Sequence, residues 1–95
     1  MKGREAFAEM LKNTANRTGE PILGEPLVEV LGNSRVLIEN HRGILEYNQQ
    51  IIRIRVNFGE IRICGDHIRL ANMNRPQLVV CGQISQICLI QRRIR

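Results

Sequence analysis

Aromatic side chains are scarce in this 95-residue chain, which has no tryptophan, one tyrosine and two phenylalanines. Proteins that bind single-stranded nucleic acid commonly stack bases on aromatic rings. Only Tyr47 and Phe58 could serve in this way, and Phe58 falls on the apolar side of its segment. The scarcity therefore disfavours nucleic-acid binding by stacking, and it leaves the core to aliphatic side chains.

Long apolar runs are also missing. Leu78 to Cys81 is among the longest, far short of the ~20 residues that cross a bilayer as a helix. Glu5 and Glu9 interrupt the amino terminus, so no signal peptide is visible. We therefore expect a cytoplasmic protein.

Signatures of catalysis are few. The only serines, Ser34 and Ser85, lack the glycine-flanked pattern of a nucleophile elbow, and no phosphate-binding loop is present. Cys64 and His67 are the nearest nucleophile–base pair, but they flank an expected turn at Gly65-Asp66, where both can face solvent. The inventory favours a protein that is not an enzyme.

Paired metal-ligand spacings are absent as well. The three cysteines, Cys64, Cys81 and Cys88, form no CxxC pair. A zinc site built from them with His41 and His67 would lack the local spacing that marks zinc ribbons. We expect no metal and no cofactor, with the cysteines acting as small apolar side chains.

Isoleucine and valine are abundant from residue 21 onward, and they favour β-structure. Residues 52–58 alternate strictly between apolar and polar side chains, and 60–64 repeat the alternation. Closely spaced turns leave no room for a long crossover helix. The pattern predicts an all-β domain, a small antiparallel meander curled into a sandwich or partly open barrel, with a solenoid as the less favoured alternative. The expected strands are 27–31, 35–39, 44–47, 52–58, 60–64, 67–70, 77–81 and 84–90.

The amino-terminal segment has a different pattern. Phe7, Met10 and Leu11 share one stripe at helical spacing within residues 3–13. We expect residues 1–20 to form a short amphipathic helix and linker, and 21–95 to form one β domain with a basic carboxy-terminal tail. The helix could pack on its own domain, on a membrane or on a partner.

Residues 36–47 read as a β-hairpin whose loop is Asn40, His41, Arg42 and Gly43. Gly43 is expected to have a positive φ angle. The loop is either an exposed turn or a recognition loop, because binding residues concentrate on loops held by a rigid sheet. The expected buried residues are Ile38, Ile52, Ile54, Val56, Ile61, Ile63, Ile68, Leu70, Leu78 and Val80.

Positive charge is concentrated in the carboxy-terminal half of the chain, and the net charge is +5. Arg53, Arg55 and Arg62 alternate with buried isoleucines, so they should share the opposite face, with Arg69 nearby. Few acidic residues accompany them: Glu60 shares the face of Arg62, and Asp66 lies in the following turn. Much of the positive charge should therefore remain uncompensated and attract an anionic surface. Alternatively, these arginines only keep the sheet soluble and blunt its edges.

The segment Ile38-Glu-Asn-His-Arg-Gly-Ile-Leu-Glu-Tyr47, followed by 52–56 and 58–63, resembles the YabP/YqfC family of bacterial sporulation proteins, the YqfC branch above all. The resemblance covers residues 26–90 and carries no catalytic residues. It implies an interaction or assembly module in the mother-cell cytoplasm during sporulation.

The partner implied by the resemblance is a protein, in particular a membrane-embedded sporulation protein, with peripheral membrane contact and homo-oligomerisation left open. The alternative function is a nucleic-acid-binding module that uses the arginine face. The missing aromatics weigh against it.

Overall fold

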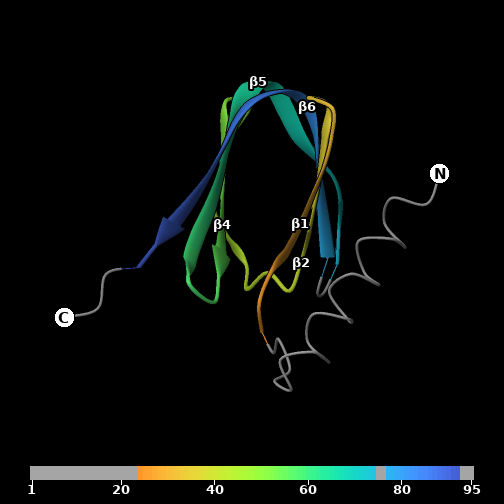
Figure 1. Ribbon diagram of the computed structural model, residues 1–95. Helices are drawn as coiled ribbons and strands as arrows, with labels where there is room; N and C mark the ends of the chain where they lie inside the picture. The colour runs from red at the N-terminus through yellow and green to blue at the C-terminus, as the bar shows by residue number, and fades with distance from the viewer. Residues whose placement is uncertain (1–23, 75–76, 93–95) are drawn as a thin grey trace.

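The protein folds as a single six-stranded antiparallel sheet that is bent into an arch (Figure 1). The computed structural model describes residues 24–74 and 77–92. The strand order is β1-β2-β6-β5-β4-β3. The strands are β1 (Leu27–Leu31), β2 (Arg35–Glu39), β3 (Ile44–Tyr47), β4 (Ile51–Val56), β5 (Gly59–Met73) and β6 (Gln77–Gln91).

The arch has two leaves because β5 and β6, each 15 residues long, pass through both. The first leaf contains β1, β2, the start of β6 and the end of β5. The second leaf contains β3, β4, the start of β5 and the end of β6. The all-β prediction is confirmed, and the amino-terminal helix and linker predicted at residues 1–20 lie outside the described residues.

The bend lies where two glycines let the long strands approach each other. A Cβ on Gly65 would collide with the carbonyl oxygen of Gln83, and one on Gly82 would lie 2.6 Å from the carbonyl oxygen of His67. The β5–β6 register shifts between Cys64 and Gly65. The bulges turn both strands without ending their pairing.

Two expected turns are therefore wrong. Gly65-Asp66 is part of the bend in β5 and does not join two strands. Residues 36–47 are not a hairpin, because β2 pairs with β1 and β6 while β3 pairs only with β4. Residues 40–43 instead cross from the first leaf to the second. Glycine and asparagine suit any sharp change of direction, so they mark the reversal without revealing which strands pair.

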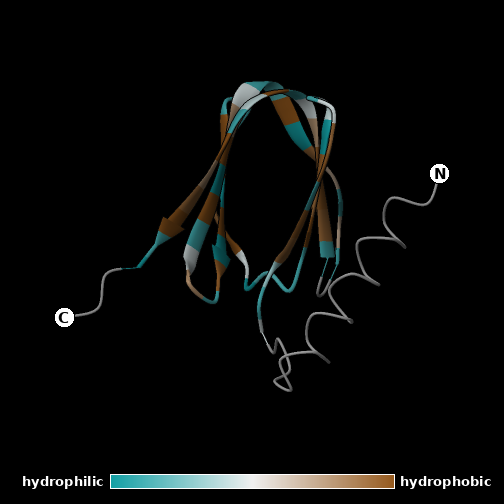
Figure 2. Ribbon diagram, in the orientation of Figure 1, coloured by the Kyte–Doolittle hydropathy of each residue, from teal (hydrophilic) through white to brown (hydrophobic). Residues whose placement is uncertain are grey.

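Aliphatic side chains fill the space between the leaves, and apolar residues alternate with polar ones along the strands (Figure 2). All the expected core residues are buried except Leu70, which is half-buried. Val36 and Ile84 also belong to the core, and Phe58 packs against it. Gly43 has the expected positive φ angle, 123°.

Candidate interaction surface

The arginine-bearing surface is the outer face of the second leaf. Arg53 lies opposite Glu46 on β3 and opposite Arg62 on β5. Arg55 lies opposite Glu60. Because directly opposed residues in antiparallel strands point to the same side of the sheet, these five side chains share one face. The strand register therefore places the three arginines on one face, as the sequence predicts.

Glu60 is the centre of an ion-pair network on this face. Its carboxylate accepts hydrogen bonds from Nε and Nη2 of Arg53 at 2.9 and 2.8 Å, and Nη2 of Arg62 lies 3.0 Å away. Arg53 also pairs with Glu46 at 3.3 Å. Only 12% of the Glu60 side chain is exposed. The two guanidinium groups, that of Arg53 above all, lower the pKa of Glu60 to about 2.

The network leaves less of the positive charge uncompensated than the sequence predicts. The charges of Arg53 and Arg62 are balanced by Glu46 and Glu60. Alternation along the strand places Glu60 on the same face as Arg62. Arg53 reaches Glu60 diagonally, because Glu60 lies directly opposite Arg55. This contact can be predicted only from the strand register, which is set by the tight β4–β5 connection at residues 57 and 58.

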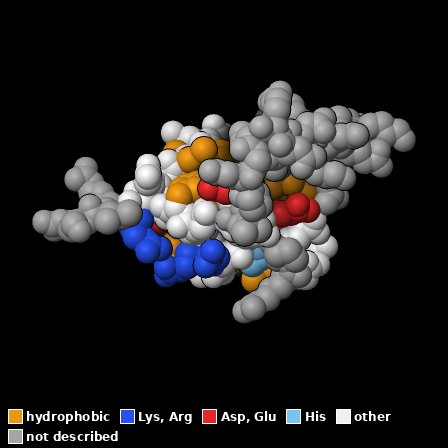
Figure 3. Space-filling model, turned by 60° about the horizontal axis from the view of Figure 1, so that its bottom comes forward, with side chains coloured by type: hydrophobic (Ala, Val, Ile, Leu, Met, Phe, Trp, Pro, Cys, Tyr) orange, Lys and Arg blue, Asp and Glu red, His pale blue; other side chains and the backbone are white. Residues whose placement is uncertain are grey.

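The unbalanced charge lies at Arg55 and Arg92. Both are exposed, and within the described part of the chain neither makes an ion pair. They line a shallow groove of about 180 Å³ together with Leu45 and Ile90. Glu60 also lines it, but its carboxylate is already paired with Arg53 and Arg62. Arginine side chains gather on one side of the open end of the arch (Figure 3). The groove thus offers guanidinium groups beside apolar carbon.

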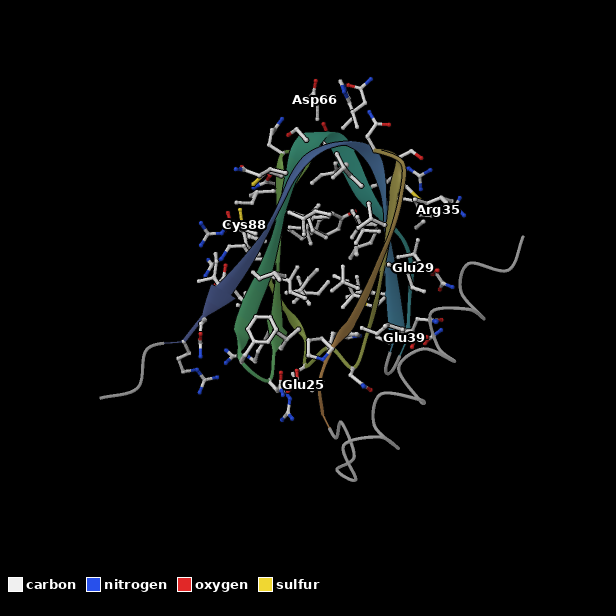
Figure 4. The ribbon with its side chains drawn as sticks, viewed as in Figure 1. Glu25, Glu29, Arg35, Glu39, Asp66 and Cys88 are labelled. Atoms are coloured by element: carbon white, nitrogen blue, oxygen red, sulfur yellow. The ribbon has the colours of Figure 1, made fainter. Side chains whose placement is uncertain are left out.

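Arg69 does not join this group. It lies past the bend, on the outer face of the first leaf, opposite Cys81, which in turn lies opposite Arg35. Figure 4 shows Arg35 and Cys88 pointing outward from opposite leaves, with Asp66 at the top of the arch. The bend in β5 therefore separates Arg69 from Arg62.

The candidate recognition loop, residues 40–43, is fastened at three places: the residues before β1, strand β4, and the β5–β6 connection. The Asn40 side chain donates to the carbonyl oxygen of Glu25 at 2.9 Å, and the backbone of Arg42 and Gly43 pairs with Arg55. Nδ1 of His41 accepts from the Gly43 N–H, so its Nε2 donates to the carbonyl oxygen of Asn74 at 3.2 Å. Asn40 and His41 therefore hold the crossover in place, and Arg42 is its exposed charged side chain.

The cysteines and histidines do not converge. Cys64, Cys81 and Cys88 are free and half-buried. In the described ranges, no group of three potential ligands lies close enough to hold a metal ion. Likewise, no helix within those ranges is long and apolar enough to span a bilayer.

Comparison with known proteins gives one match. The model of the YabP family matches residues 24–95, which include every described residue. No curated protein and no solved structure matches the chain. The match covers most of the chain, so the protein belongs to the YabP family. It is a match to the family as a whole, and the assignment to the YqfC branch stays a prediction.

Proposed function

From membership of the YabP family, we propose that the protein is a non-enzymatic interaction and assembly module of sporulation. It acts in the mother-cell cytoplasm and binds a membrane-embedded sporulation protein. The groove at Arg55 and Arg92 carries this proposal, because it offers exposed cations next to apolar side chains. Guanidinium groups in such a setting suit carboxylates of an acidic protein surface.

Arg55 and Arg92 differ from the neighbouring arginines of this face, whose charges are neutralised by carboxylates. Arg53 and Arg62 are held by Glu60 and need no external anion. An acidic partner gains little from them, whereas at Arg55 and Arg92 it meets uncompensated charge. Electrostatic complementarity of this kind governs the association rate and the choice of partner.

The test is complementation of a spore-forming host that lacks its own family member. Arg55→Gln with Arg92→Gln should reduce both sporulation and recovery of the tagged protein with membranes. The matched control is Arg35→Gln with Arg69→Gln, two exposed arginines of the first leaf, which should behave as the unchanged chain. Treating the membranes with protease before adding the purified protein should abolish binding if the partner is a protein.

The proposal fails if the unchanged chain restores sporulation and both double variants do so equally. Binding that survives protease and depends on anionic lipid would point to a membrane surface instead. The nucleic-acid alternative requires salt-dependent binding of random oligonucleotides that the Arg55/Arg92 variant loses.

A further inference from the structure

The two sides on which the leaves approach each other are built differently. On one side, β3 lies near the end of β5, and we call this the bridged seam. There the hydroxyl oxygen of Tyr47 accepts a hydrogen bond from the N–H of Leu70 at 3.0 Å. On the other side, β1 lies near residues 84–87 of β6, and we call this side, down to the end of β6, the open seam. Among the described residues, no hydrogen bond joins these two strands across it.

The open seam exposes backbone groups along the end of β6. The N–H of Arg92 donates to the carbonyl oxygen of Phe58, so it points toward the β4–β5 side. Backbone groups alternate in direction along a strand. Those of Ile87, Leu89 and Gln91 therefore point into the open seam, where no described strand pairs with them. This is an available edge for another strand.

The same edge carries apolar side chains that the core does not cover. Leu89 lies opposite the fully buried Ile61, yet 66% of its surface is exposed. Val30, across the seam on β1, is 49% exposed. Val30 also lines a groove of about 190 Å³, together with Ile84 and Ile87. Apolar side chains of an added strand could pack against these residues.

Building on the proposed function, we propose that the partner binds through an extended acidic segment that adds to the free edge of β6 at residues 87–91. Alternate side chains of this segment are apolar and enter the open seam beside Leu89 and Val30. The intervening side chains are acidic and lie on the outer face, where Ile90 and Arg92 are located. Strand addition gains affinity from main-chain hydrogen bonds and specificity from alternate side chains.

Charge favours such a partner over a second copy of this chain. Residues 85–92 contain no acidic side chain and end in Arg92, and the whole chain carries a net charge of +5. Pairing of β6 with β6 of another copy would give Arg92 no carboxylate from that strand. A foreign acidic strand supplies one.

The probe is a displayed library of random decapeptides selected on the full chain. We expect the enriched peptides to alternate apolar residues with Asp or Glu. Leu89→Lys, which places a charge in the open seam, should weaken their binding by roughly tenfold or more. Leu31→Lys is the matched control, because Leu31 is similarly exposed, 60%, but lies on the outer face of the first leaf.

Amide hydrogen exchange provides an independent measurement that needs no variant. Bound peptide should slow exchange at Ile87, Leu89 and Gln91. In an added strand, every second amide N–H faces β6. N-methylation of those amides should abolish binding, whereas N-methylation of the intervening amides should not.

Several outcomes would overturn the proposal: no enriched pattern, equal binding by Leu89→Lys, protection at other residues, or protection of these amides already in the free protein. A dimer in solution that Leu89→Lys converts to monomer would instead assign the edge to a second copy. If the membrane partner no longer binds the Arg55→Gln, Arg92→Gln variant but binds Leu89→Lys normally, the proposed function stands and strand addition is rejected.

Discussion

The two leaves share one construction and differ in their outer faces. Each combines a two-stranded hairpin with one arm of β5 and one of β6. In the first leaf, the carbonyl oxygens of Asn33 and Ser34 accept from Ile84 and Gly82 on β6. In the second, Gln49 and Gln50 accept from Ile68 and Gly65 on β5. The same device anchors both hairpin loops at the bend.

The outer faces carry different chemistry. On the first leaf, Leu37 is only 7% exposed although it points away from the core residues on either side of it, and its paired neighbour on β6 is Val79. On the second leaf, the corresponding surface holds Arg53, Glu60 and Arg62. The inner faces thus define a shared fold, and the outer faces are free to specialise. Binding is more readily assigned to the second leaf, because its outer face carries the ion-pair network and the groove at Arg55 and Arg92.

The largest expected effect is at the two glycines of the bend, Gly65 in β5 and Gly82 in β6, whose roles should be equivalent. Gly65→Ala and Gly82→Ala should each destabilise the domain by about 4 kcal/mol or more, since each Cβ would meet backbone atoms that cannot move aside. Urea unfolding measures this. Gly32→Ala is the control, because a Cβ there meets nothing within 4 Å, and its positive φ should cost about 1 kcal/mol. If only one of the two variants were destabilised, the two glycines would not have equivalent roles in the bend.

The inner faces should respond alike in both leaves. Ile54→Ala in the second leaf and Ile38→Ala in the first remove fully buried side chains. Each should lower the free energy of unfolding by ~2–5 kcal/mol. A loss below about 0.5 kcal/mol in either variant would mean that this leaf does not share the common core.

The ion-pair network should add a pH dependence that belongs to the second leaf. The pKa of Glu60 is lowered to about 2 in the folded protein. Its stabilisation is therefore complete above its ordinary value near 4.5 and is lost as pH falls toward 2. Partial exposure keeps the effect near 1 kcal/mol. Glu60→Gln should remove this part of the acid transition, and an unchanged acid profile would contradict the pairing.

The smallest effect is expected at the exposed arginines. Arg55→Gln and Arg69→Gln should each change the free energy of unfolding by less than about 0.5 kcal/mol, since neither makes an ion pair in the described part of the chain. Only Arg55→Gln should weaken partner binding. Calorimetry together with the membrane-recovery assay separates the two quantities. Equal binding losses would remove the functional difference between the leaves.

Local pattern was sufficient for most strands and for the buried face. Alternation in residues 52–58 identifies Ile52, Ile54 and Val56 as buried, and all three are. Pairing across long sequence separations was not accessible in this way. Val36 pairs with Val80 because the arch brings β2 to β6, and no local signal distinguishes that choice from pairing with β3.

The candidate surface was predictable only in part. The shared face of Arg53, Arg55 and Arg62 follows from alternation. Their unequal roles depend on cross-strand neighbours, since Glu60 pairs with Arg53 and Arg62 but not Arg55. The separation of Arg69 depends on the bend, and the open seam depends on which edges remain after the sheet is assembled.

The pairing of β2 with β6 has a consequence for the order of folding. β5 and β6 are neighbours in sequence, and β3 and β4 lie just before them, so these four strands can assemble through short loop closures. β2 must then close a loop of some forty residues to reach β6. Until it arrives, residues 77–81 of β6, Leu78 and Val80 included, are paired with β5 on one side only and leave an apolar edge open on the other. We therefore expect pulsed amide exchange during refolding to show protection of β2 last, and a nascent chain to be most prone to aggregation in that interval.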